Sequence, residues 1–315
     1  LKTQAEHLAG WLQAQGVGAG DRVALYLQNC PQFVVALYAI FRANAVAVPV
    51  NPMNRADEFG HYISDPETKV VICAADLAGF VAEADAALPP AQRLKAVLVT
   101  RYSDTMPQGA LDPAEAPNAA IEQWLRADPP LPAGTVRWTD ALAAGHVPGP
   151  HSAGPDDLAL LPYTSGTTGL PKGCMHTHRT LMHNVLAGAI WGCSTSETIG
   201  LGVVPMFHIT GMLYGLHVPI YLGSCAVIMP RWDRDVAGRL ISTYKVTSWT
   251  MVPTMMIDLL ASPNVARYDL SSLQYIGGGG AAMPQAVAQK LLDQFGLKFV
   301  EGYGLTETAA PSHSN

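Results

Sequence analysis

The sequence predicts an α/β fold of two successive subdomains, each built on a mainly parallel sheet covered by helices. Short apolar runs, typical of strands buried on both faces, alternate with segments of helical periodicity along most of the chain. The alternation stops in residues 101–155, which are rich in Pro, Ala, Gly and Asp, and then resumes. We therefore expect one subdomain over residues 1–150 and a second over residues 151–315.

The first subdomain is expected to begin with a helix, because Thr3 and Glu6 match a capping box and apolar residues follow at helical spacing. Strands are predicted at residues 22–27, 45–50, 69–74 and 94–100. Helices are predicted between them at residues 31–42, 55–64 and 76–87. Residues 101–155 are expected to form a loop or boundary segment with one short helix near residues 119–126.

The second subdomain repeats the alternation of strand and helix. Strands are predicted at residues 158–163, 199–204, 222–229, 246–250, 273–276 and 298–301. Helices are predicted at residues 177–191, 208–218, 234–244, 253–261 and 284–295. After Glu301 we expect a polar loop that runs to Asn315.

Composition excludes several classes of protein. The chain has 315 residues, of which 49% are hydrophobic and 14% charged, and this is too apolar for a disordered protein. Lysine and arginine number 19 against 25 acidic residues, and no basic block occurs, so nucleic-acid binding is not expected. The five cysteines are odd in number and form no CxxC pair, which favours reduced thiols in a cytoplasmic protein.

Residues 198–230 contain no Asp, Glu, Lys or Arg and are long enough to suggest a membrane span. Pro205, Pro219 and several glycines interrupt this stretch, and it divides into a strand, a helix and a strand. We therefore expect no transmembrane segment, while a membrane-embedded protein stays an alternative that solubility without detergent would exclude.

A loop typical of phosphate binding runs from Tyr163 to Gly173, between a predicted strand and a predicted helix. Its glycines free the backbone N–H groups to converge on an anion, its hydroxyl residues add donors, and Lys172 adds a positive charge. The glycines are Gly166, Gly169 and Gly173, and the hydroxyl residues are Thr164, Ser165, Thr167 and Thr168. The loop is not a Walker A motif, because Pro171 stands where that motif needs glycine.

The segment from Leu161 to Lys172 resembles the AMP-binding signature of the adenylate-forming enzymes, which include acyl-CoA synthetases, nonribosomal peptide synthetase adenylation domains and firefly luciferases. Further segments resemble motifs of this family in the family's order, namely residues 20–24 with 29–31, 48–52, 205–211, 278–283 and 301–308. Within the family, the sequence is most similar to bacterial fatty-acyl-CoA ligases. The resemblance implies the large N-terminal domain of the adenylate-forming fold, without the smaller C-terminal lid domain.

The resemblance also implies a role for residues of each motif. Lys172 would lie at the phosphates of ATP and His208 beside the acyl carboxylate. Thr306 would bond the α-phosphate, and Glu307 would hold Mg²⁺, which makes these four the catalytic residues. Tyr303 would stack on the adenine. The implied nucleotide-binding set is Thr164, Ser165, Gly166, Thr167, Thr168, Gly169, Lys172, Gly280, Ala281, Ala282, Gly302, Tyr303, Gly304 and Thr306.

Taken without the resemblance, three of these residues have plainer explanations. A lone His208 in an apolar run is more often a core histidine, Tyr303 fits a core or turn, and Glu307 fits a solvated loop.

The implied reaction is ATP-dependent activation of a carboxylic acid to acyl-AMP, followed by transfer to coenzyme A. Amino-acid-activating relatives place an Asp at the start of the motif that matches residues 205–211, and this sequence has none there. A medium- or long-chain fatty acid is therefore the expected substrate, with aryl acids second. A nucleotide-binding module that is inactive without its lid is the alternative function. Peripheral membrane contact and a homodimer stay open.

Overall fold

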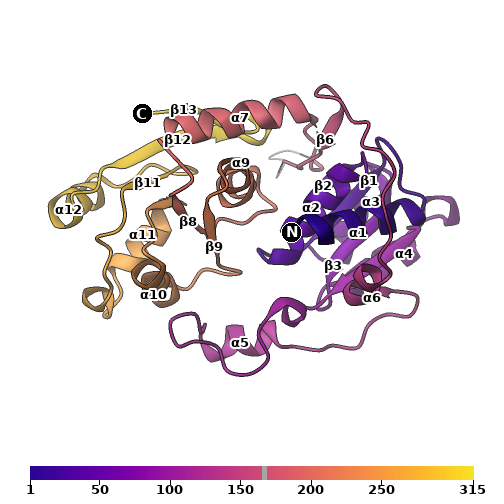
Figure 1. The fold of residues 1–315 in the computed structure, drawn as a ribbon, viewed down its shortest axis with the longest axis horizontal. Coiled ribbons are helices and arrows are strands. Elements are labelled where there is room, and N and C mark those ends of the chain that lie inside the picture. The colour runs from indigo at the N-terminus through magenta and orange to yellow at the C-terminus, as the bar shows by residue number, and fades with distance from the viewer. Residues whose placement is uncertain (165–168) are drawn as a thin grey trace. The chain divides into compact units, whose positions relative to one another are not determined.

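The structure is a computed structural model that describes residues 1–164 and 169–315. The chain divides into two compact units, and each is described by itself. Unit 1 comprises Leu1–Met106 with Gln123–Thr180, and unit 2 comprises Pro107–Glu122 with Leu181–Asn315. The expected fold class is confirmed, because each unit contains a mainly parallel sheet with helices (Figure 1).

Unit 1 contains a sheet of seven strands in the order β5-β4-β3-β1-β2-β6-β7, parallel except for the β6–β7 pair. The strands are β1 (Arg22–Tyr26), β2 (Val46–Pro49), β3 (Thr68–Ala74), β4 (Ala96–Thr100), β5 (Val136–Arg137), β6 (Leu158–Leu160) and β7 (His176–Thr177). The central strand β1 pairs in register with both neighbours, Val23 with Ala47 of β2 and with Val70 of β3. Its residues from Val23 on are completely buried, as the continuous apolar run predicts.

The helices of unit 1 are α1 (Lys2–Ala14), α2 (Pro31–Arg42), α3 (Ala56–Ser64), α4 (Ala78–Ala87) and α6 (Trp138–Ala143). Helix α1 packs on α2 and α6, and α3 packs on α4. The apolar faces of these helices supply the core, with Leu8, Leu12, Phe33 and Leu37 fully buried.

Residues 101–155 are more structured than the sequence predicts. They hold α5 (Ala119–Leu125), as expected, and also strand β5 and helix α6. Helix α6 exists because Trp138 and Ala141 are buried against α1 and β4. A two-residue strand and a six-residue helix are too short to leave a periodic signal, so only tertiary packing defines them.

Unit 2 contains a sheet of six strands in the order β13-β12-β11-β10-β8-β9. The strands are β8 (Ile199–Gly202), β9 (Cys225–Ile228), β10 (Ser248–Met251), β11 (Tyr275–Gly278), β12 (Phe299–Leu305) and β13 (Ala310–Ser314). All pairs are parallel except β12–β13. The helices are α7 (His178–Trp191, of which Leu181–Trp191 lies in this unit), α8 (Ile209–Met212), α9 (Val218–Leu222), α10 (Arg234–Tyr244), α11 (Pro253–Leu260) and α12 (Gln285–Phe295).

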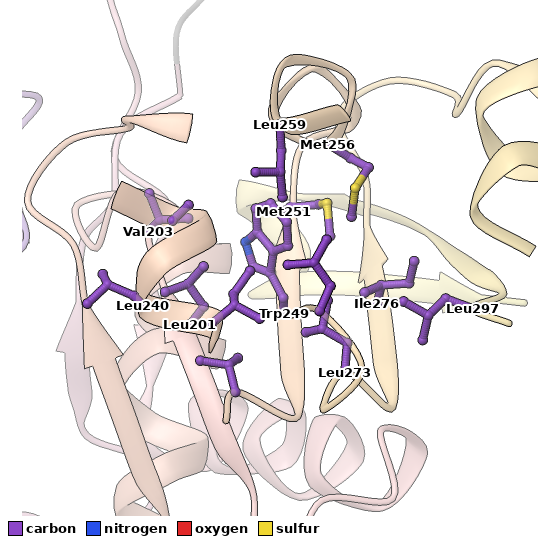
Figure 2. Close-up of a cluster of buried hydrophobic side chains, with 14 of the residues drawn as sticks. Leu201, Val203, Leu240, Trp249, Met251, Met256, Leu259, Leu273, Ile276 and Leu297 are labelled. Carbon is purple, nitrogen blue, oxygen red and sulfur yellow. The ribbon is translucent and has the colours of Figure 1, made fainter. Parts of the chain in front are cut away.

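The core of unit 2 is an apolar cluster around the fully buried Trp249 of β10 (Figure 2). Leu201 of β8 and Ile276 of β11 join it from the neighbouring strands, and Leu240 of α10 and Leu259 of α11 join it from the helices. Because side chains alternate along a strand, Trp249 and Met251 point into this core while Ser248 and Thr250 point to the opposite face of the sheet.

The charge-free residues 198–230 fold as the expected strand, helical segment and strand. The helical part runs through α8, a π turn at Leu213–His217 and α9. No helix in the described residues is long and apolar enough to cross a membrane.

The expectation of a polar loop after Glu301 is wrong. Strand β12 continues to Leu305, and the chain returns as β13, so that Gly302 faces Ser314 and Tyr303 faces His313. The sequence conceals this hairpin because glycine has low strand propensity. Glycine is nevertheless required at position 304, where a Cβ atom would lie 2.3 Å from the carbonyl oxygen of Ala310.

Candidate active site

The phosphate loop is closed at its base by backbone hydrogen bonds of unit 1. Tyr163 and Gly173 form an antiparallel bridge, and the Thr164 N–H donates to the Lys172 carbonyl at 3.0 Å. One step outward, the Cys174 N–H donates to the Pro162 carbonyl at 2.9 Å. These bonds bring the predicted phosphate-binding residues Thr164 and Lys172 side by side at the base of the loop.

Lys172 and Gly169 are both exposed. Lys172 forms no ion pair with any residue of the described ranges 1–164 and 169–315, so its ammonium group is available to an anion. The remaining predicted phosphate ligands, Ser165, Gly166, Thr167 and Thr168, lie outside the described residues.

In unit 2, two glycines let three strands approach at the carboxyl edge of the sheet. A Cβ atom on Gly278 would lie 1.7 Å from the Met251 carbonyl oxygen, and one on Gly279 would lie 2.1 Å from the Gly302 carbonyl oxygen. No side chain fits at either position. Gly280 has a φ of +82°, a conformation that favours glycine, and it turns the chain away from the sheet.

That turn presents the predicted adenine-side residues. Gly280, Ala281 and Ala282 are exposed, and the Met283 N–H then donates to Glu301 Oε1 at 2.9 Å. This bond ties the segment to the strand that carries Tyr303. The carboxyl edge of a parallel sheet is where α/β proteins commonly bind ligands.

Tyr303 is 61% exposed on β12, which is unusual for an aromatic residue in a strand. Its ring lies 6.1 Å from the His313 ring across the hairpin, and its neighbours Gly302 and Gly304 carry no side chains that could cover it. Gly302 is also the residue that Gly279 approaches, so the structure brings the Gly280–Ala282 turn and the Gly302–Gly304 strand together. The plainer explanation of Tyr303 as a core residue does not hold.

Thr306 and Glu307 lie in the short 3-10 turn Thr306–Thr308 that joins β12 to β13. The Leu305 N–H donates to Thr308 Oγ1 at 3.0 Å, and Ala309 and Ala310 adopt positive φ angles of 57° and 93°. Such angles are costly for alanine and persist only where surrounding contacts impose them.

Asn184 of α7 supplies those contacts, and the sequence gives no signal for it. Its side-chain amide donates to the carbonyl oxygens of Thr308 and Ala309, each at 2.8 Å. Helix α7 accordingly lies along the β12–β13 hairpin (Figure 1). A helical asparagine that binds carbonyl groups more than 120 residues away cannot be distinguished from any other polar surface residue in a single sequence.

Glu307 is exposed at the tip of this turn and forms no ion pair with a described residue. No group of three or more His, Cys, Asp or Glu side chains that could hold a metal occurs in the described part of the chain. One carboxylate fits Mg²⁺ in a nucleotide site, because this ion takes most of its ligands from phosphates and water.

His208 immediately precedes α8, at the carboxyl end of β8. Its carbonyl oxygen accepts the Met212 N–H at 2.9 Å. A Cβ atom on Gly211 would lie 2.1 Å from the Pro205 carbonyl oxygen, so only glycine allows this helix to start so close to the preceding loop. The residue is exposed, and partial desolvation lowers the pKa of its imidazole, which is therefore neutral at pH 7. Helix α8 also contacts β13, so His208 belongs to the same edge of unit 2 as the Glu307 turn.

A small cavity of about 30 Å³, large enough to admit water, lies on the sheet face opposite Trp249. The strands contribute Gly200, Ser248 and Thr250 to its lining, and the helical segment after His208 contributes Tyr214 and Val218. Hydroxyl residues are thus frequent in the lining of this cavity.

Comparison with known proteins gives consistent matches. The sequence matches the family of AMP-binding enzymes over residues 1–315. It is 32% identical to a long-chain-fatty-acid–CoA ligase of Bacillus subtilis, with 100% of this chain and 56% of that protein covered. It is 31% identical to 4-coumarate–CoA ligase 1 of Arabidopsis thaliana, with 93% of this chain and 49% of that protein covered. The chain spans about half the length of these curated relatives.

The structure is similar to the inhibitor-bound N-terminal domain of FACL13 from Mycobacterium tuberculosis, with a TM-score of 0.80 and 27% identity. The similarity covers 98% of this chain and 68% of that chain.

Proposed function

The chain belongs to the family of AMP-binding enzymes, and on that premise we propose that it is the nucleotide- and acid-binding part of an AMP-forming acid–thiol ligase. The full-length enzyme activates a carboxylic acid with ATP and passes the acyl group to coenzyme A. The observation that carries this proposal is the carboxyl edge of unit 2, where an exposed Tyr303 ring, the Gly280–Ala282 turn and the exposed Glu307 occur together.

In the proposed first step, a carboxylate oxygen of the acid attacks the α-phosphorus of ATP, and the bond to pyrophosphate breaks. The acid is already ionised at pH 7, so no general base is needed. The barrier is mainly electrostatic, because two anions must meet in line. Lys172 offsets the phosphate charge, and the Thr306 hydroxyl donates to the α-phosphate. Mg²⁺, held by Glu307, would neutralise further charge.

In the proposed second step, the coenzyme A thiol attacks the acyl carbon, its proton is lost, and the bond from that carbon to the AMP oxygen breaks. His208 is neutral at pH 7, so it can bond the acyl group without holding the carboxylate as an ion pair. Because the chain spans about half the length of its relatives, the activity is proposed for the full-length protein. We expect the 315-residue chain alone to bind ATP weakly and to form little acyl-CoA.

For the acid, we propose a medium- or long-chain fatty acid. The helical segment after His208 buries Ile209, Met212, Leu213 and Leu216, and residues 198–230 contain no charge that could pair with a substrate ammonium group. Burial of each CH₂ group of a fatty acid would add about 0.8 kcal/mol to binding. The similarity to a long-chain-fatty-acid–CoA ligase supports the same class.

An aryl acid is the second candidate. The 31% identity to a 4-coumarate–CoA ligase supports this class.

Pyrophosphate release by the full-length enzyme tests these proposals. Straight-chain fatty acids, 4-coumarate, benzoate and apolar amino acids are compared at equal ATP. We expect kcat/KM to rise with fatty-acid length and amino acids to be poor substrates. A maximum with 4-coumarate would select the aryl class, and a maximum with an amino acid would contradict both.

A further inference from the structure

Helix α3 of unit 1 and its C-cap residue Asp65 contact the two ends of the phosphate loop. At one end, Nε2 of His61 lies 2.7 Å from the Pro171 carbonyl oxygen. At the other end, the Tyr163 hydroxyl donates to Asp65 Oδ2 at 2.5 Å. His61 and Asp65 are four residues apart, so they lie on the same side of the helical turn.

The donor and the acceptor of each of these two hydrogen bonds can be assigned. A carbonyl oxygen only accepts hydrogen bonds, so Nε2 of His61 carries the hydrogen. The His61 ring also packs edge-on to the Tyr163 ring at 5.6 Å, and the Tyr62 ring packs on Tyr163 at 4.7 Å. Burial and the Asp65 carboxylate raise the pKa of Tyr163, so its phenol stays protonated and acts as the donor.

Each contact is one residue away from a proposed phosphate ligand. Pro171 precedes Lys172, and Tyr163 precedes Thr164. The loop base is in turn closed by the bond from the Thr164 N–H to the Lys172 carbonyl. A shift of either anchored residue therefore moves the backbone of a ligand directly.

Helix α3 is itself held firmly. Phe59 and Ile63 are buried, and the helix packs on α4 and β3. At its start, the Arg55 N–H donates to Glu58 Oε2 at 2.9 Å, and the Arg55 guanidinium lies 4.8 Å over the Phe80 ring. His61 and Asp65, which contact the loop, are thus held in place by the packing of α3 on α4 and β3. Their position does not depend on the residues of the loop.

We propose that His61 and Asp65 are positioning residues that preorganise the phosphate loop for ATP. The inference rests on the proposed function, since it assumes that the loop receives the phosphates of ATP. Neither residue touches the nucleotide in this assignment. Each acts through the loop end that it holds, and together they keep Thr164 and Lys172 at one spacing before ATP arrives.

The test compares variants of the full-length protein in direct ATP titration and in pyrophosphate release. His61→Ala and Asp65→Ala should each weaken ATP binding about tenfold, the effect of one lost hydrogen bond of ordinary strength. KM for the acid should stay within a factor of two, because the proposed acid site after His208 does not include the loop. His61→Gln, which keeps an N–H donor, and Asp65→Asn, which keeps an acceptor, should restore most of the affinity.

Asp57→Ala is the matched control, because Asp57 is exposed on the same helix and forms no ion pair with a described residue. Thermal unfolding of all variants separates positioning from stability. A purely structural role would lower Tm and raise KM for ATP and for the acid together, and that result would overturn the proposal.

The outcomes also separate this inference from the proposed function. If the wild-type protein binds ATP and His61→Ala and Asp65→Ala bind it equally well, the positioning role is wrong and the proposed function stands. If the wild-type protein neither binds ATP nor releases pyrophosphate with any acid, the proposed function fails, and this inference fails with it.

Discussion

The two units hold their candidate ligand-binding residues by different means. In unit 1, the side chains of His61 in α3 and of its C-cap residue Asp65 contact the ends of the phosphate loop. In unit 2, backbone packs directly on backbone, because Gly278 and Gly279 leave no room for a side chain. A site held by side-chain contacts should tolerate conservative replacements, whereas a site formed by close backbone approach should tolerate none.

The largest effects are expected where each unit supplies charge to the reaction. Lys172→Ala in unit 1 and Glu307→Ala in unit 2 should each cost about 2.7–4 kcal/mol of transition-state stabilisation, the usual effect of losing one preorganised electrostatic contact. Both side chains are exposed, so folding should be unaffected. The measurement is kcat/KM for pyrophosphate release by the full-length enzyme, and unchanged values in both variants would remove these residues from the mechanism.

Gly278→Ala tests the backbone packing of unit 2. The added Cβ would lie 1.7 Å from the Met251 carbonyl oxygen, and backbone atoms cannot step aside as a side chain can. We expect a loss of stability at or above the upper end of the ~1–3 kcal/mol typical of overpacking. Urea denaturation measures it.

Gly79→Ala in α4 is the control, because its Cβ would meet nothing within 4 Å. Gly79 lies in the first turn of α4, so this variant should keep the free energy of unfolding within about 0.5 kcal/mol of the wild-type value. Equal stability of the two alanine variants would show that Gly278 does not lie so close to the Met251 carbonyl oxygen.

Tyr303 allows a further test of the difference between the two units. It is an exposed side chain on β12, the strand that Gly279 approaches closely. Tyr303→Ala should weaken ATP binding by about 1–3 kcal/mol through loss of stacking on the base, whereas Tyr303→Phe should keep most of the affinity. Calorimetric titration with ATP and with inorganic triphosphate distinguishes binding of the adenosine part of ATP from binding of its phosphates. Triphosphate binding should be the same in all three proteins, and a drop there would argue against an adenine contact.

The smallest effect is expected at Asn184, whose side chain binds the Glu307 turn from helix α7. Asn184→Ala removes the donor to the Thr308 and Ala309 carbonyl oxygens and should cost about 0.5–1.5 kcal/mol per bond lost. Activity should fall with the Mg²⁺ affinity, because the turn carries Glu307. A Mg²⁺ titration of pyrophosphate release should therefore shift to higher concentration, and an unshifted titration would separate Asn184 from the metal-binding role.

Much of this fold could be predicted because parallel strands buried on both faces leave continuous apolar runs, as in β1 and β3. The glycines and hydroxyl residues between Tyr163 and Gly173 can be recognised in the sequence as a candidate phosphate loop, because anion binding requires those residue types together, and this assignment stays a prediction. Elements defined by tertiary contact were not predictable. Helix α6 depends on the burial of Trp138, and the β12–β13 hairpin contains glycines that normally argue against a strand.

The contacts of His61 and Asn184 could not be predicted for a related reason. His61 and Asn184 bind backbone carbonyl groups more than 100 residues away, and a carbonyl group belongs to every residue type. Their partners therefore leave no mark in the sequence, whereas charged or aromatic candidate residues such as Lys172 and Tyr303 do.

The attack of a carboxylate on the α-phosphorus of ATP is the central claim, and isotope transfer tests it most directly. A fatty acid labelled with heavy oxygen in its carboxyl group is incubated with the full-length enzyme, ATP and coenzyme A, and the products are analysed by mass spectrometry. We predict one labelled oxygen in AMP and none in pyrophosphate, because the oxygen that attacks phosphorus stays on it when the thiol takes the acyl group. Acyl-CoA formed with unlabelled AMP, or with the label in pyrophosphate or inorganic phosphate, would contradict the account.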